Sequence, residues 1–405
     1  MMGRFVLKSY LFAIGALVLC CSIVYAAEFD LEVNTGATYD TNFLRIDPSD
    51  RNDAYFTLSP RAALKMPANK AYSSFGVRGV WEEHLVKTSQ DLQELVIAGL
   101  GRYNPSYNIS LSMRDEIILS GRLRSIVGRD DDLVSDNITI EGLDSDAPPE
   151  GRSDEVFRKR EFADNRFLAA MRYEYKGGEQ AVSLEYTNII RDYRDTETDD
   201  WVANAGLLTI EDPLGHRTST SLNLGLIRKS YQVGMNYVSI PASVSLERQL
   251  GNKFKSAISL GVEGRRYSEE FDEEKYRTTP TAGLKITGQF APKATSWLRV
   301  QRTFFDSDMW TGDAFVSNAF DMSVILALTD AVRFTLEGLY SRNDYVTRDS
   351  QRDDDFFLGY AEVRYINSTL GSISLRYGYE RRNSDIVHDY VEHTIELYHL
   401  RRLTF

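Results

Sequence analysis

The chain ends with two segments in which apolar and polar residues alternate: Gly371–Glu380, with the sequence GSISLRYGYE, and Tyr390–Phe405, with the sequence YVEHTIELYHLRRLTF. In the first segment the odd positions from Ile373 to Tyr379 are apolar or aromatic, and the even positions are polar or small. Successive side chains of a β-strand point to opposite faces, so each segment has one apolar and one polar face. The pair therefore predicts an antiparallel hairpin.

The same alternation recurs along the chain, from Phe29–Tyr39 to Phe334–Gly338. Each segment has about 10–13 residues, the length that a tilted strand needs to cross a bilayer. No long stretch places apolar residues at the i, i+3, i+4 spacing of an amphipathic helix. Short turns such as Pro67–Lys70 alternate with longer acidic connections such as Asp192–Asp200. This pattern predicts an all-β, antiparallel, up-and-down transmembrane β-barrel with both termini on the short-turn, periplasmic side.

One strand for each crossing gives about 18 strands, an even number like those of bacterial single-chain barrels. Trp201–Ile210 alternates poorly, and if it is a loop the number falls to about 16. Pro60, Pro241 and Pro280 fall inside predicted strands, where a missing N–H is unfavourable, and the sequence offers no reason for them. A soluble β-sandwich or solenoid would also alternate. The continuous apolar face and the alternating loop lengths favour the membrane barrel.

The first 26 residues have the pattern of a secretory signal peptide, which assigns 27–405 to the barrel. Arg4 and Lys8 precede the apolar run Leu11–Val24, and a small residue, Ala26, follows. An uncleaved anchor or a lipoprotein signal ending at Cys20 are the alternatives. Removing the two positive charges of Arg4 and Lys8 takes the formal net charge from −12 to −14. An acidic chain without basic clusters predicts no nucleic-acid binding.

Composition supports a barrel rather than a helical membrane protein. The chain has 23 Tyr and 20 Phe but only 10 Pro. Its mean hydropathy of −0.34 excludes a helical bundle in a membrane. Aromatic residues near the ends of predicted strands are expected to form interfacial girdles: Tyr39, Phe43, Trp81, Tyr103, Tyr267, Trp297 and Tyr340.

Charged residues alternate with the apolar face, so they are expected to line the lumen if the apolar face meets lipid. The predicted pore-lining residues are Arg61, Arg78, Glu82, Arg114, Arg172, Glu174, Glu185, Glu263, Arg265, Lys285, Arg299, Arg333, Glu337, Arg364, Arg376 and Glu380. So wide a barrel encloses water, and its charges would set solute preference in a hydrophilic conduit. Alternatively, the charges form cross-strand pairs around a plugged lumen.

No residue pattern indicates catalysis or metal binding. The acidic runs Asp130–Asp132 and Asp353–Asp355 lack the ligand spacing and central glycine of a calcium loop. No G-x-S-x-G or H-E-x-x-H motif accompanies the five histidines. We therefore expect no enzyme, no cofactor and no metal. The longest connection, 121–165, is either a surface loop or a segment that enters the pore.

Several features resemble known bacterial proteins. The terminal Phe405, which closes an alternating strand, resembles the signal that the barrel-assembly machinery recognises in outer-membrane proteins. Tyr39-Asp40-Thr41-Asn42-Phe43, Leu58-Ser59-Pro60 and Phe162-Ala163-Asp164-Asn165, with Tyr186 and Tyr193, resemble the β-barrel porin families that include members found with exopolysaccharide-export machinery.

This resemblance implies an outer-membrane conduit for a secreted polysaccharide or another polar solute. Its expected partners are outer-membrane lipid and lipopolysaccharide, the barrel-assembly machinery and periplasmic polysaccharide-export proteins. A structural or adhesive barrel with partner-binding loops, or a barrel hydrolase, are the alternative functions.

Overall fold

The computed structural model describes residues 27–41, 52–85, 92–120, 162–175, 180–193, 200–232, 236–271, 274–306, 314–346, 351–367, 371–384 and 389–404. Every regular element in these ranges is a β-strand. The described residues contain no helix that is long and apolar enough to cross a bilayer. The strands are β1 Glu28–Asp40, β2 Asp53–Pro67, β3 Ala71–His84, β4 Leu92–Ser106, β5 Ile109–Ser120, β6 Phe162–Tyr175, β7 Gln180–Tyr193, β8 Trp201–Gly215, β9 Thr218–Tyr231, β10 Tyr237–Leu250, β11 Phe254–Phe271, β12 Glu274–Ala291, β13 Ala294–Asp306, β14 Ala314–Ala327, β15 Val332–Val346, β16 Gln351–Asn367, β17 Gly371–Ser384 and β18 Tyr390–Thr404.

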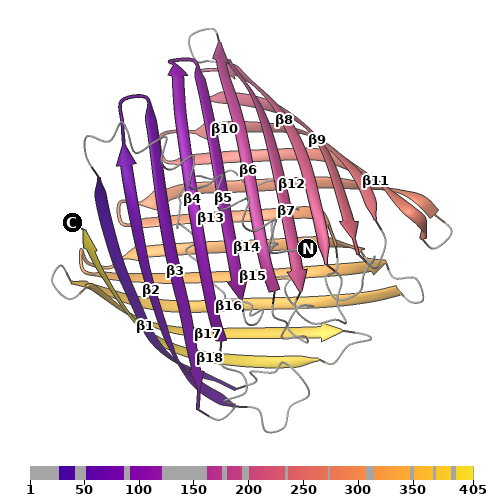
Figure 1. Ribbon diagram of the computed structural model, residues 1–405. Coiled ribbons are helices and arrows are strands. Elements are labelled where there is room, and N and C mark those ends of the chain that lie inside the picture. The colour runs from indigo at the N-terminus through magenta and orange to yellow at the C-terminus, as the bar shows by residue number, and fades with distance from the viewer. Residues whose placement is uncertain are drawn as a thin grey trace.

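The strands form one closed, antiparallel sheet of 18 strands. Each strand pairs with its neighbours in the chain, and β1 pairs with β18 from Asp30↔Thr404 to Asp40↔Thr394. Closure leaves no free sheet edge at the meeting of the two ends of the chain, as a bilayer requires. Figure 1 shows the result as a tilted barrel, in which β3–β7 cross in front of β13–β17. The predicted fold class and strand number are confirmed.

The doubtful segment Trp201–Ile210 is part of a full-length strand, β8. It alternates poorly because its inward positions, such as Ala203 and Leu207, are as apolar as its outward ones, such as Val202 and Leu208. A strand that is apolar on both faces has no period-two hydropathy signal. The alternative of about 16 strands is therefore wrong.

The two ends of the barrel differ. The short turns 68–70, 107–108, 216–217, 251–253, 292–293 and 328–331 lie at the same end as the start of β1 and the end of β18. We call this the short-turn end and the other the long-connection end. The connection predicted as 121–165 is shorter, because β6 begins at Phe162. The rest of it lies outside the described residues, as do the predicted signal peptide and Phe405.

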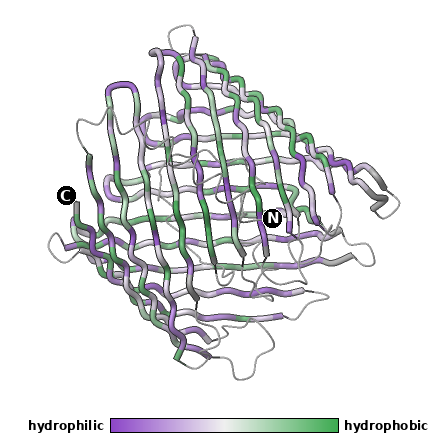
Figure 2. Tube along the Cα trace, in the orientation of Figure 1, coloured by the Kyte–Doolittle hydropathy of each residue, from purple (hydrophilic) through white to green (hydrophobic). Residues whose placement is uncertain are grey.

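Apolar side chains cover the outside of the barrel. Large apolar residues such as Phe56, Leu224 and Leu375 are 42–55% exposed and alternate with buried polar residues. Figure 2 shows this alternation as bands of green and purple along each strand. Outward apolar side chains on a closed barrel are what lipid requires. One exception is Asp115, which lies on the outer face of β5 and accepts a hydrogen bond from Asn165 Nδ2 at 3.2 Å.

The girdle prediction is partly wrong. Tyr39, Trp81, Tyr103 and Tyr340 are outward-facing and 43–56% exposed. Tyr267, however, is only 2% exposed, in an inward-facing cluster with Trp201 and Tyr237. Trp297 shares the inner face of β13 with Arg299, whose guanidinium lies 6.0 Å from its ring centroid. Phe43 lies outside the described residues.

Two of the three unexplained prolines face glycine. The β2–β3 pairing skips Pro60 and resumes on both sides of it, and the flanking register places Gly79 opposite. The β9–β10 pairing likewise skips Pro241, which lies opposite Gly225. A Cβ on Gly225 would lie 2.6 Å from Pro241 Cγ, so only glycine leaves room for the ring. The ladder thus accommodates these prolines as local interruptions.

Candidate functional site: the barrel interior

The charged side chains predicted to line the lumen all lie on the inner face, opposite the exposed apolar side chains of their own strands. They are Arg61 on β2, Arg78 and Glu82 on β3, Arg114 on β5, Arg172 and Glu174 on β6, Glu185 on β7, Glu263 and Arg265 on β11, Lys285 on β12, Arg299 on β13, Arg333 and Glu337 on β15, Arg364 on β16, and Arg376 and Glu380 on β17. That they contact a passing solute stays a prediction.

Most of these arginines pair with carboxylates on the same strand or one or two strands away. Arg172 makes two hydrogen bonds of 2.8 Å to Glu211 on β8, where its planar guanidinium matches the carboxylate. Glu362 accepts from Arg364 at 2.7 Å and from Arg376 at 3.2 Å, so it joins β16 to β17. Further pairs of this kind are Arg78–Glu94, Arg114–Glu116, Arg265–Glu263 and Arg299–Asp321. In each of these pairs the two charges largely cancel.

A few inward charges have no such partner. Among the described residues no ion pair involves Lys285, Arg333 or Glu185, and the two cations are exposed to the lumen. An unpaired charge acts on a nearby ion as a net charge, whereas the opposite charges of a pair largely cancel. These three side chains are therefore the members of the predicted set best placed to attract or repel an ion.

A cluster of cations and aromatic rings lies on the inner face near the long-connection end. We call it the Trp201 cluster, and it comprises Asp164, Arg191, Trp201, Lys229 and Tyr231. Arg191 donates two hydrogen bonds to Asp164, at 2.8 and 2.9 Å, and both residues are 1% exposed. The Trp201 ring lies 4.3 Å from Lys229 Nζ and 5.3 Å from the Arg191 guanidinium. Cation–π contacts and ion pairs thus hold these charges away from water.

The Trp201 cluster was missed from the sequence, and so was the apolar inner wall beside it. Val96, Ile118, Ile189 and Ala205 are inward-facing and at most 3% exposed, in one cluster with Trp201. The poor alternation of β8 is the sequence feature that indicates this patch, because apolar residues on both faces of a strand remove the two-residue hydropathy pattern. The inner wall is therefore not polar throughout.

Charged inward side chains are mostly buried at the long-connection end, and several are exposed at the short-turn end. Arg382, Asn343 and Asp53 are at most 1% exposed. At the other end, the side chains of Lys255 and Arg402 are 55% and 56% exposed. The interior is thus open to solvent mainly from the short-turn end.

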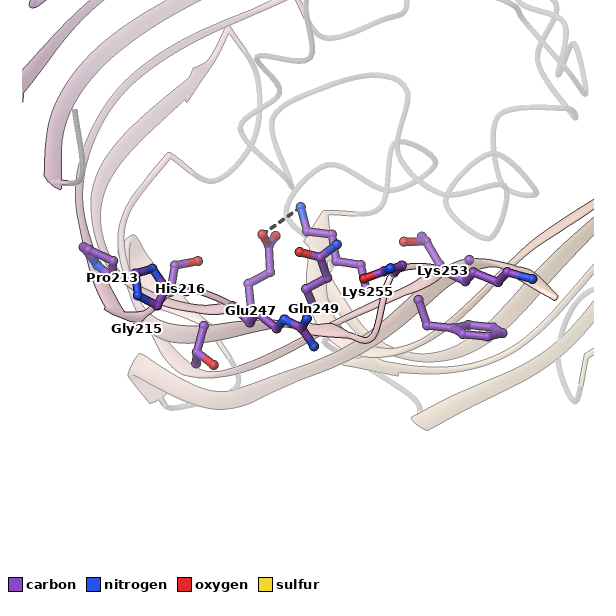
Figure 3. A pocket seen from close by; sticks show the side chains of 14 residues that line it. Pro213, Gly215, His216, Glu247, Gln249, Lys253 and Lys255 are labelled. Carbon is purple, nitrogen blue, oxygen red and sulfur yellow. Dashed lines mark ion pairs between the residues drawn. The ribbon is translucent and has the colours of Figure 1, made fainter. Parts of the chain in front are cut away.

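A hollow of about 590 Å³ lies at the short-turn end, on the inner side of β9–β12. It is lined by the cations Arg217, Lys253 and Lys255 and by the acid Glu247, which binds Lys255 Nζ at 2.7 Å. Figure 3 shows the Glu247–Lys255 pair between the two turns that close this hollow. A polar recess at an open mouth can hold water or a hydrophilic solute.

No protein-family model and no curated protein matches the chain. Solved structures do. OpdK of Pseudomonas aeruginosa, an outer membrane protein, aligns with a TM-score of 0.53 and 10% identity over 94% of this chain and 100% of that one. OccK9 (OpdG) of P. aeruginosa aligns with the same TM-score, identity and coverage. OccAB4 of Acinetobacter baumannii gives a TM-score of 0.52 and 8% identity, over 94% and 99% of the two chains.

These likenesses show the fold, which is that of outer-membrane porins. Together with the apolar outer face of the closed barrel, they place the chain in an outer membrane.

Proposed function

We propose that the protein is a conduit for polar solutes across the outer membrane. The observation that carries this proposal is the charged inner wall of a closed 18-stranded sheet, open to solvent at its short-turn end. So many charged groups are stable only when they are paired or hydrated, and an interior of this width holds water. We further propose that the short-turn end, with both termini, faces the periplasm.

The two ends of the lumen would have different roles. Solute enters at the exposed short-turn mouth, where Lys285 and Arg333 present unpaired positive charge. At the long-connection end inward side chains such as Asn343 and Arg382 are buried, so passage is restricted there. The conduit is thus selective at one end and restrictive at the other.

The solute class that we propose is a polysaccharide secreted from the cell, with other polar solutes as the broader class. The sequence resemblance to barrels of exopolysaccharide export supports it. So does Arg376, whose guanidinium lies 4.6 Å and 5.7 Å from the inward rings of Tyr360 and Tyr398. Aromatic rings beside a hydrogen-bond donor are suited to a sugar ring. Among similar structures, OccK2 of P. aeruginosa has been solved in complex with glucuronate, a sugar acid.

Liposome swelling tests the conduit. Proteoliposomes placed in an isotonic solution of a permeant sugar should swell, and the rate should fall as the sugar grows from a monosaccharide to an oligosaccharide. Vesicles with heat-denatured protein are the control. Equal rates for the native and denatured samples would contradict an open lumen. Loss of extracellular polysaccharide in a deletion strain, with normal synthesis of the polymer, tests the solute class separately.

A second candidate function is a structural or adhesive barrel whose surface binds a partner. The buried inward side chains of the long-connection end, such as Asn343 and Arg382, favour it, because a lumen filled at that end would not conduct. Unimpaired secretion in the deletion strain, together with absent swelling, would support this function. If the protein is the conduit, we expect periplasmic polysaccharide-export proteins to co-purify with it.

A further inference from the structure

The barrel wall is incomplete between β12 and β13. Their pairing runs from the short turn 292–293 to Ala282↔Arg302 and ends there. Yet β12 continues to Glu274, paired with β11, and β13 continues to Asp306, paired with β14. Within the described residues, no backbone pairing joins 274–281 to 303–306. We call this the β12–β13 seam; it lies at the long-connection end, beside the β11–β12 hairpin at the right of Figure 1.

Pro280 accounts for the end of the pairing. Gln289 donates its backbone N–H to Lys253 beside β11, and the β11–β12 register is unbroken from there to Pro280. Backbone groups of successive residues face alternate neighbours, so even-numbered residues of β12 face β13. Pro280 therefore lacks its N–H on the side of β13, at the position opposite the carbonyl of Phe304.

A side chain replaces the missing hydrogen bond. Arg265 Nη2 donates to the Phe304 carbonyl at 3.0 Å, and its guanidinium lies 3.8 Å from the Phe304 ring centroid. Glu263 holds Arg265 through a 2.7 Å contact to its Nε, and accepts from Ser239 at 2.7 Å. Phe304 is 1% exposed and Arg265 is 5% exposed. Side chains rather than backbone hydrogen bonds therefore seal the seam.

The two other interior prolines provide an internal comparison. Pro60 and Pro241 each face a glycine, and the strand pairing resumes beyond each of them. Pro280 faces Phe304 and the pairing does not resume. A proline alone thus interrupts the ladder of this barrel by a residue or two. At Pro280 the opening is longer, and the Arg265–Phe304 contact lies beside it.

Cations lie around the seam. Arg277, which lies opposite Arg265 in the β11–β12 register, is 5.7 Å from the Phe304 ring. On the outer side, Arg266 lies 5.6 Å from the exposed ring of Tyr276. Arg302, at the last strand pair, also faces outward. Guanidinium groups favour phosphate and carboxylate. The outward side chains around them include the polar Thr278 and Asn318, and the apolar Val262 and Phe320 lie nearer the short-turn end.

We propose that the β12–β13 seam is a lateral opening, through which an amphiphile with an anionic headgroup and an alkyl chain passes between the lumen and the surrounding lipid. Arg265 and Phe304 form its latch. In the closed state the latch satisfies the Phe304 carbonyl, which lipid cannot do. In the open state the arginines bind the headgroup while the alkyl chain stays among the outward apolar side chains. This goes beyond the axial conduit, and it does not depend on it.

Photo-crosslinking from the membrane tests the opening. The photoreactive residue benzoylphenylalanine replaces Thr281, on the inner face next to the seam, or Val80, on the inner face of the distant strand β3. Vesicles carry radiolabelled dodecyl phosphate as the probe. A lateral opening predicts labelling at Thr281 well above that at Val80, because a probe that entered along the lumen would reach both.

Two variants change the latch in opposite directions. Pro280→Val restores the N–H opposite Phe304 and should lower labelling at Thr281 about fivefold, the shift expected from one added hydrogen bond. Arg265→Gln weakens the latch and should raise the labelling. Pro241→Val, at a proline where the pairing resumes, is the matched control and should leave it unchanged.

Equal labelling at Thr281 and Val80 in the unmodified and Arg265→Gln proteins would overturn the proposal, as would labelling that Pro280→Val leaves unchanged. Heat-modifiable migration in detergent gels confirms that each variant is folded. Sugar permeation of the same samples reports the axial conduit independently.

Discussion

At the scale of single residues, the charges of the inner wall fall into two groups that burial separates. Asp164 and Arg191 are buried and bind each other through two hydrogen bonds. Lys255 and Glu247 are bound at a similar distance but are about half exposed. Removing one partner from a buried pair leaves a charge without compensation, whereas water replaces the lost partner of an exposed one.

We therefore predict that Asp164→Leu lowers the free energy of unfolding by about 3 kcal/mol, because Arg191 stays buried without its carboxylate. Lys255→Ala, the exposed control, should cost less than about 1 kcal/mol. Urea unfolding in detergent micelles, followed by tryptophan fluorescence, measures both. The double variant Asp164→Leu/Arg191→Leu should recover much of the loss. Equal costs for the two single variants would show that burial does not separate the groups.

At the scale of strands, the residues of the outer face could be predicted from the sequence, and those of the inner face could be predicted only in part. Alternation in segments such as Ile373–Tyr379 identifies the lipid side, because lipid accepts apolar side chains alone. The inner face meets water, other side chains and the neighbouring wall, so it tolerates both Arg61 and Ala203. The apolar inner patch and the inward positions of Tyr267 and Trp297 depend on these contacts, which lie far apart in the sequence.

The prolines show the same limit of sequence reasoning. Pro60 and Pro241 each lie opposite a glycine, but that relation exists only in the register between neighbouring strands. A single sequence without the register shows only a proline in a strand. The predicted lumen charges depended on alternation within one strand, which the sequence does contain, and all of them lie on the inner face.

The facing glycines give a prediction for the β9–β10 pair. Gly225→Ala places a Cβ 2.6 Å from Pro241 Cγ, so it should destabilise the barrel by about 1–3 kcal/mol through overpacking. Gly79→Ala is the matched control, because its Cβ would lie 3.8 Å from Pro60 Cγ, an ordinary contact. Pro241→Ala should rescue Gly225→Ala in the same unfolding assay. A cost for Gly79→Ala as large as that for Gly225→Ala would contradict this packing.

At the scale of the whole molecule, the structure is a closed wall with an apolar exterior and a largely neutralised interior. The paired charges cancel one another's fields across the strands, so ion preference is set by the few that remain unpaired. Lys285 and Arg333 are two such cations in the described part of the lumen, and both are exposed. The net effect should be a weak preference for anions.

Reversing these two charges tests that expectation. We predict that Lys285→Glu/Arg333→Glu lowers the anion-to-cation permeability ratio by about twofold or more, because both unpaired positive charges of the lumen become negative. The reversal potential in a salt gradient across a planar bilayer measures the ratio. Lys293→Glu, on the solvent-exposed turn that joins β12 to β13, is the control and should change the ratio much less, because bulk solvent screens a charge there. An unchanged ratio in the double variant would exclude these side chains from the solute path.

Single-channel recording of the purified protein in planar bilayers shows whether the barrel encloses a continuous aqueous path. We expect stepwise, ohmic conductance that rises with salt concentration. Absence of any conductance, both in the full chain and in a variant that lacks residues 121–161, would contradict it.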